Sequence, residues 1–210
     1  IQAMALIKAA AAEANGALGH LPKAQAKAIS GAANAIAAGE FAEQFPVDVF
    51  QTGSGTSSNM NLNEVIAALV KRQAKLVVHP NNHVNLGQSS NDVVPSSSLL
   101  ASALLLNRLL LPALKQLRQS VAKKARQGRG LLKTGRTHLM DAMPMTVEQE
   151  LSGWQAQLDS AMQRLQDTGK RLLALPLGGT AVGTGVNADP KMTVLACRIL
   201  SKNTGLRITP

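Results

Sequence analysis

The sequence is poor in cysteine and in aromatic residues. It has one cysteine, Cys197, no tyrosine, and an aromatic content of 2%. A single cysteine excludes an internal disulfide framework and fits a reducing compartment. No uninterrupted run of about 18 apolar residues occurs, so we predict no membrane-spanning segment. Residues 1–4 lack the basic flank and cleavage pattern of a signal peptide, and we expect a cytoplasmic protein.

Acidic residues are also scarce. There are 12 Asp and Glu against 22 Lys and Arg, which gives a formal net charge of +10. Such a balance is typical of nucleic-acid-binding proteins. Here, however, no basic run exceeds two residues, and the densest stretch, residues 123–136, has no aromatic side chain to stack on a base. We therefore expect no nucleic-acid partner, and interpret the charge as a solvated basic face or as local attraction for an anionic substrate.

Motifs for metals and organic cofactors are missing too. The two histidines of His79-Pro80-Asn81-Asn82-His83 have the i, i+4 spacing of metal ligands, but Pro80 disfavours a continuous helix through them. No cluster of Cys or Asp joins them. The sequence has no phosphate-binding loop or dinucleotide motif, and nothing marks a serine as the nucleophile of a catalytic triad. We expect no metal and no cofactor.

Long helical patterns dominate what is present. The hydrophobic content of 45% is mostly Ala, Leu, Val and Ile, and Ala and Leu favour helices. Apolar periodicity predicts helices over residues 1–18, 23–38, 61–74, 96–126 and 146–175. The last keeps a seven-residue apolar repeat that needs helical neighbours, and Pro112 should kink the one before it. We predict an all-α fold, with a small N-terminal helical domain over residues 1–88 and part of a long-helix bundle over residues 89–210.

Three polar clusters interrupt these helices, over residues 52–59, 88–92 and 135–144. The first, which opens at Thr52, mixes glycines with hydroxyl side chains, and the second is rich in Ser and Asn. The third holds His138 between a hydroxyl and a guanidinium. Each also has a purely structural interpretation, namely a capping turn, a helix N-cap and a structural histidine. Together they predict a site that binds carboxylates through neutral hydrogen bonds, with His138 for proton transfer.

Four ordered blocks carry a resemblance to one enzyme superfamily. They are Gln51-Thr52-Gly53-Ser54-Gly55-Thr56-Ser57-Ser58-Asn59-Met60-Asn61, then residues 79–92, 135–144 and 177–185. Through them the chain resembles the fumarase/aspartase superfamily, and most closely the class II fumarases. Ser54, Ser90 and His138 favour the fumarases, because aspartases tend to carry Ala, Thr and Gln at these positions.

The resemblance implies a reaction and a set of site residues. The reaction is the reversible addition of water to fumarate, giving L-malate through an aci-carboxylate intermediate without metal or cofactor. His138 would be the catalytic acid–base group at the reacting centre, with Thr137 beside it. The residues implied to bind the dicarboxylate substrate are Ser54, Gly55, Thr56, Ser89, Ser90, Asn91 and Thr137. A second dicarboxylate site is implied at His79, Pro80, Asn81 and Asn82, although Asn82 replaces a usual Asp there and Leu76 replaces a usual basic residue.

The resemblance also implies an assembly and a missing part. Members of the superfamily form homotetramers with shared active sites. Their third catalytic block, a mobile Gly-Ser-Ser loop, lies beyond the equivalent of residue 210. The chain is thus similar to an N-terminal portion, and we expect it to be weakly active or inactive alone. Two alternatives stay open, an aspartate ammonia-lyase or other lyase of the superfamily, and a non-catalytic helical scaffold.

Overall fold

A computed structural model describes residues 1–48, 50–51 and 53–210. Thr52, which opens the first polar cluster, lies outside the described residues. The chain forms two compact units, one of residues 1–102 with 172–210 and one of residues 103–171. These units reflect compactness alone and do not test the domains expected over residues 1–88 and 89–210, which stay a prediction.

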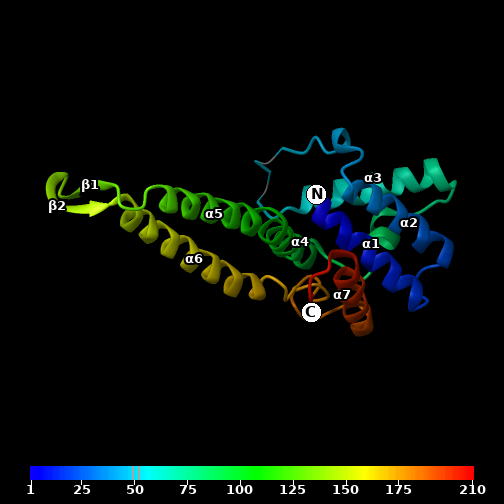
Figure 1. Cartoon of the computed structure of the whole chain (residues 1–210). Coiled ribbons are helices and arrows are strands. Elements are labelled where there is room, and N and C mark those ends of the chain that lie inside the picture. Colours follow the sequence, from blue (N-terminus) through cyan, green and yellow to red (C-terminus); the bar gives the residue numbers. More distant parts are fainter. Residues whose placement is uncertain (49, 52) are drawn as a thin grey trace. The chain divides into compact units, whose positions relative to one another are not determined.

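The first unit is built around helix α1 (Gln2–Ala17). Eleven of its sixteen residues are buried, and it contacts α2 (Lys23–Ala37) and α7 (Pro190–Thr204) (Figure 1). A helix that is apolar around most of its circumference is stable only when neighbours cover it. Small side chains allow the close approach, since a Cβ added at Gly16 would lie 2.6 Å from the Cβ of Ala26.

The other elements of this unit place the first two polar clusters at helix starts. They are the short 3-10 helix η1 (Ala42–Gln44), α3 (Thr56–Ala74), the π-helical turn η2 (Pro80–Val84) and α4 (Ser90–Leu105). Both long helices begin several residues before the starts predicted at residues 61 and 96. The Ser, Thr and Asn residues of the clusters form their first turns, where side chains of this kind can bond otherwise free N–H groups.

In the second unit, α5 (Leu111–Gln127) and α6 (Val147–Arg171) lie side by side (Figure 1). Near its end α6 packs closely on the π-helical turn η3 (Leu106–Leu110), because a Cβ at Gly169 would lie 2.6 Å from the Leu106 side chain. Pro112 falls in the first turn of α5, directly after η3. The kink predicted at Pro112 is observed as the π-helical turn η3 just before it. Proline has no N–H to donate to the preceding turn, so the regular helical hydrogen bonding changes there.

An antiparallel hairpin, β1 (Leu132–Thr137) and β2 (Met140–Thr146), joins α5 to α6. The sequence pattern predicts only a connecting segment between the two long helices here, and the two strands correct that prediction. The turn residues His138 and Leu139 have φ values of 52° and 64°, the left-handed backbone of a two-residue hairpin turn, without the Asn or Gly that usually announces one. The all-α class is confirmed, since this two-stranded sheet is the only sheet within the described part of the chain.

Two further findings differ from the sequence analysis. The sequence pattern predicts no helix over α7, although Asp189 caps it by accepting a hydrogen bond from the Lys191 N–H. In addition, the helical stretch Ser90–Gln127 is long and apolar enough to cross a membrane by length and composition. Polar residues interrupt its apolar runs, Ser102 and the pair Asn107-Arg108 among them, so a search for an uninterrupted run misses it. It is weak evidence for a membrane segment, because the core helix of a soluble protein passes the same test.

Candidate functional site

The start of α4 is fixed by the carboxylate of Asp92. Its Oδ1 accepts a hydrogen bond from the Ser89 N–H at 2.9 Å, and its Oδ2 accepts from the N–H groups of Gly178 and Thr180 at 2.9 and 3.0 Å. Asp92 is 2% exposed, so its charge is committed to these three donors rather than to solvent. The carboxylate also lies in the first helical turn, where the helix dipole favours it. Asp92 therefore anchors the loop of residues 177–185 to the start of α4.

Ser89 and Asn91 are oriented by this arrangement. The Ser89 hydroxyl accepts a hydrogen bond from the Asn91 N–H at 3.2 Å, which is N-cap geometry. The Asn91 side-chain amide donates to the Ala181 carbonyl at 2.6 Å. The capping interpretation of this cluster is thus correct, and it leaves the Ser89 hydroxyl proton and the Asn91 Oδ1 available for a ligand.

The first cluster meets the second through two contacts. The Asn59 amide on α3 donates to the Ser90 hydroxyl at 3.0 Å. Gly55, the residue before α3, has φ of 72°, and a Cβ there would lie 2.7 Å from Val94 Cγ1 on α4. Only glycine fits both the backbone angle and the close approach. The starts of α3 and α4 are therefore held together, and residues 54–56 lie beside residues 89–91.

This pairing places hydroxyl and amide groups of two helix starts side by side. Ser54 and Thr56 are exposed, and their hydroxyl oxygens lie 3.1 Å apart. The two helix starts add backbone N–H groups and the positive ends of two helix dipoles. Neutral hydroxyl and amide donors at converging helix starts suit a carboxylate. The structure thus brings together the predicted residues Ser54, Gly55, Thr56, Ser89, Ser90 and Asn91.

Thr137 and His138 belong to the hairpin of the second unit. His138 is exposed in the turn, and Thr137 pairs with Met140 beside it. Arg136 Nε donates to Asp141 Oδ1 at 3.1 Å across the hairpin. The imidazole is therefore accessible and flanked by an ion pair. Its predicted role as the catalytic acid–base group stays a prediction.

The residues of the expected second dicarboxylate site form the start of η2. His79 Nδ1 accepts hydrogen bonds from the N–H groups of Asn81 and Asn82, at 3.1 and 3.2 Å, and Pro80 occupies the first position of the turn. The backbone N–H of His79 in turn donates to Nδ1 of His83 at 2.7 Å. The imidazole ring thus takes the two amides that an anion would otherwise use at this turn. Binding of a second dicarboxylate here stays a prediction.

Comparison with known proteins places the chain in a family. Residues 1–210 match the model of a family described as lyase. The chain belongs to the lyase family. It is 57% identical to the class II fumarate hydratase of Xylella fastidiosa, over 98% of this chain and 44% of that protein. It is 48% identical to the class II fumarate hydratase of Thermus aquaticus, over 98% of this chain and 45% of that protein.

Solved structures agree on the lyase fold. The class II fumarase of Schistosoma mansoni matches with a TM-score of 0.93 and 38% identity, over 97% of this chain and 44% of that one. A fumarate lyase:delta crystallin from Brucella melitensis, bound to cobalt, matches with a TM-score of 0.94 and 40% identity, over the whole chain and 46% of that one. The chain spans less than half the length of the relatives it matches.

Sequence reasoning misses a buried polar side chain that lies near the paired starts of α3 and α4, namely Lys8. Lys8 is fully buried on α1, and its ammonium donates to Asn85 Oδ1 at 2.7 Å. Burial lowers the pKa of Lys8 to about 7, partly opposed by the charge of Asp92. The one sign of this burial in the sequence is that Lys8 stands within a run of small apolar residues.

Proposed function

We propose that the natural protein containing this chain catalyses the reversible hydration of fumarate to L-malate. The observation that carries the proposal is the convergence of residues 54–56 and 89–91 at the paired starts of α3 and α4. A surface of hydroxyl and amide donors suits the carboxylates of a small diacid. The class II fumarate hydratases among the relatives support this choice of diacid.

The chemistry follows from where charge develops. Removal of the C3 proton of malate, by a base that the resemblance assigns to the Gly-Ser-Ser loop of the third catalytic block, places negative charge on the adjacent carboxylate, as an aci-carboxylate. Fixed donors aimed at that carboxylate stabilise this charge more than they stabilise the ground state. Ser89, Ser90 and Asn91 supply donors of this kind, with Ser54 and Thr56 beside them. His138 protonates the departing hydroxyl, or activates water in the reverse direction, because an imidazole exchanges protons near neutral pH.

The proposal includes an assembly of several copies. Thr137 and His138 stand on an exposed hairpin, while the carboxylate-binding residues stand on helix starts of the first unit. We propose that a homotetramer brings these groups together at shared sites. The exposed apolar side chains of the second unit, Leu117 and Trp154 among them, support such an assembly.

The test uses the full-length natural protein and three readings. L-malate should give alkene absorbance, aspartate should give no ammonia, and turnover should persist in a metal chelator. Release of ammonia from aspartate would instead identify an ammonia-lyase, and no turnover with either substrate would favour the non-catalytic scaffold. The isolated 210-residue chain should show little or no turnover.

The role of His138 is tested by substitution. His138→Asn should lower kcat by about 100-fold or more, as expected for loss of a general acid–base group. His20→Asn is the matched control, because His20 is also partly exposed but bonds Asp189 instead of a substrate. A rate within a few-fold of the parent for His138→Asn would exclude the proposed role.

A further inference from the structure

We propose that Lys8 is a positioning residue for substrate binding, which acts through Asn85 and Asn59 to make the Ser90 hydroxyl a donor toward the substrate carboxylate. The inference rests on the proposed function and adds to it a residue far from the substrate. Lys8 is buried and is not one of the residues proposed to bind the substrate.

The four residues form a continuous path of hydrogen bonds. Lys8 Nζ on α1 donates to Asn85 Oδ1 at 2.7 Å. Asn59 Nδ2 on α3 lies 3.5 Å from the same oxygen and donates to Ser90 Oγ at 3.0 Å. The other end of the Asn85 amide donates to the Gln88 carbonyl at 3.2 Å. Three elements distant in sequence thus converge under the start of α4.

The direction of each bond follows from the chemistry of Lys8. In its protonated form, which predominates below its pKa of about 7, the Lys8 ammonium has three donors and no acceptor, so Asn85 must turn its oxygen toward it. That oxygen then faces the Asn59 amide, which must present its NH2 group. The same NH2 group reaches Ser90, whose hydroxyl oxygen must accept. The Ser90 proton is therefore free to point away from the protein interior, toward a bound carboxylate.

Loss of Lys8 would weaken this directional order, because only the Gln88 carbonyl would then hold the Asn85 amide in its orientation. Amide side chains can present either oxygen or nitrogen, so Asn85 and Asn59 could rotate together. If Asn59 presented its oxygen, the Ser90 hydroxyl would donate inward and the substrate would lose a donor. The ammonium also adds a positive charge beneath an anion site, balanced in the free protein by the charge of Asp92.

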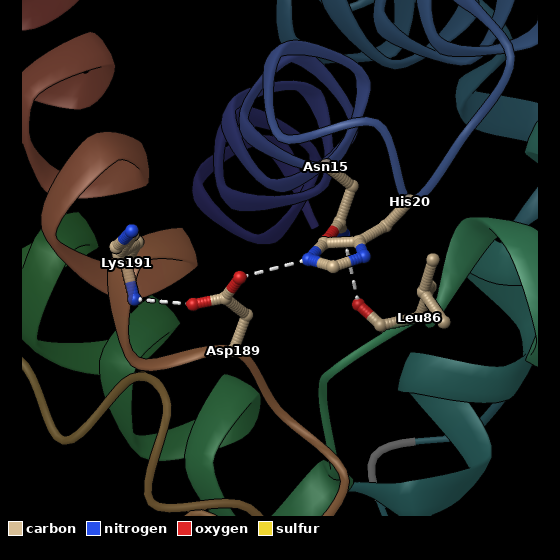
Figure 2. A network of polar contacts seen from close by, with 5 residues as sticks. All are labelled: Asn15, His20, Leu86, Asp189 and Lys191. Carbon is tan, nitrogen blue, oxygen red and sulfur yellow. Dashed lines mark hydrogen bonds and ion pairs between the residues drawn. The ribbon is translucent and has the colours of Figure 1, made fainter.

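A purely structural role for Lys8 is the competing explanation, and Asn15 separates the two. Asn15 lies on the same helix, is also buried, and donates from its side chain to the Leu86 carbonyl at 3.1 Å (Figure 2). It therefore ties α1 to the same segment as Lys8 does. Its bond ends on a backbone carbonyl and does not reach Ser90.

The experiment compares Lys8→Met, Asn59→Leu and the control Asn15→Leu in the full-length protein. KM for fumarate should rise about 10-fold or more in Lys8→Met and in Asn59→Leu, the scale of a lost hydrogen bond to a charged group, with kcat within a few-fold. KM of Asn15→Leu should change less than about threefold. The double variant Lys8→Met/Asn59→Leu should resemble either single variant, because both interrupt one path.

Three results would overturn the inference: an unchanged KM in Lys8→Met, an equal rise in Asn15→Leu, or additive effects in the double variant. If Lys8→Met does not fold, Asn59→Leu against Asn15→Leu makes the same comparison. If the parent shows no turnover, the dissociation constant of succinate, measured by calorimetry, replaces KM. Turnover in the parent without these KM changes would refute the role of Lys8 and leave the proposed function standing.

Discussion

The two units use their apolar residues in opposite ways. In the first, α1 buries eleven of sixteen residues, including Lys8 and Asn15. In the second, α6 runs for 25 residues and buries only Gly169. The first unit therefore has a core of its own. The long helices of the second leave most of their surface uncovered.

The same difference separates the two halves of the proposed site. Residues 89–91 are held by the buried Asp92 carboxylate, which accepts from the Ser89 N–H, and by the Asn59 amide, which donates to the Ser90 hydroxyl. Residues 54–56 are held beside them by the close approach of Gly55 to Val94. The second unit instead exposes large apolar side chains that are at least half accessible, namely Leu105, Leu109, Leu117, Leu132 and Trp154. Apolar surface of this extent is what the proposed assembly would cover. The first unit is thus preorganised by its own interior, whereas the second unit buries little of its helices' surface within itself.

The largest expected effect comes from removing a buried charge. Asp92→Ala would leave three N–H donors without their acceptor, and should lower the free energy of unfolding by about 3–5 kcal/mol. Asp159→Ala is the counterpart in the second unit, because Asp159 bonds the exposed Arg118. It should change the free energy of unfolding far less, because solvent screens an exposed ion pair. Urea unfolding of both variants measures the difference, and equal losses would remove the distinction between the units.

Gly55→Ala should come next, because the new Cβ meets both an unfavourable φ and Val94. We expect a loss of about 2–4 kcal/mol, from left-handed strain together with overpacking. Gly19→Ala has a similar φ of 83° but open space around the Cβ, and should lose only about 1–2 kcal/mol. The contact between α3 and α4 would be unimportant if the two variants unfolded at the same urea concentration.

Trp154→Glu tests the exposed face of the second unit. A charge at this position should weaken association of copies by roughly 2 kcal/mol or more, as at a buried interface aromatic. Light scattering after size-exclusion chromatography should then show a smaller mass than the parent. Val77→Glu is the control on the first unit, where Val77 is 77% exposed, and should keep the parent mass. A full-mass Trp154→Glu assembly would count against the proposed interface.

The smallest effect concerns an exposed pair. A hydrogen bond from the His20 ring, followed by one from the Lys191 N–H, lowers the pKa of Asp189 below its ordinary value of 3.8 (Figure 2). Because the pKa of Asp189 is lower in the folded protein than in the unfolded chain, its carboxylate stabilises the fold above pH 3.8. This contribution is lost as the pH falls through the pKa of the folded state. His20→Ala should therefore raise the pKa of Asp189, as measured by NMR titration. In the second unit, a hydrogen bond from Lys170 on the same helix lowers the pKa of Asp167. Lys170→Ala should therefore raise the pKa of Asp167.

The sequence predicts the helices well where periodicity is strong. The starts and ends of α1 and α2 fall within about two residues of prediction, within the range by which boundary assignments differ. It does not predict the hairpin at His138, because that turn uses a left-handed backbone without glycine or asparagine. The two polar clusters that contain residues 54–56 and 89–91 are recognised from the sequence, because each cluster is a contiguous run. Lys8 is not predicted, because its partners Asn85 and Asn59 lie far away in sequence and only folding brings them together.

The most direct test of the account is a crystal structure of the full-length protein with bound succinate. The account predicts one carboxylate within hydrogen-bond distance of Ser90 Oγ and of Ser54 or Thr56. It also predicts His138 from some copy in the assembly within reach of the central carbons. A diacid bound elsewhere, with His138 of every copy remote from residues 89–91, would contradict it.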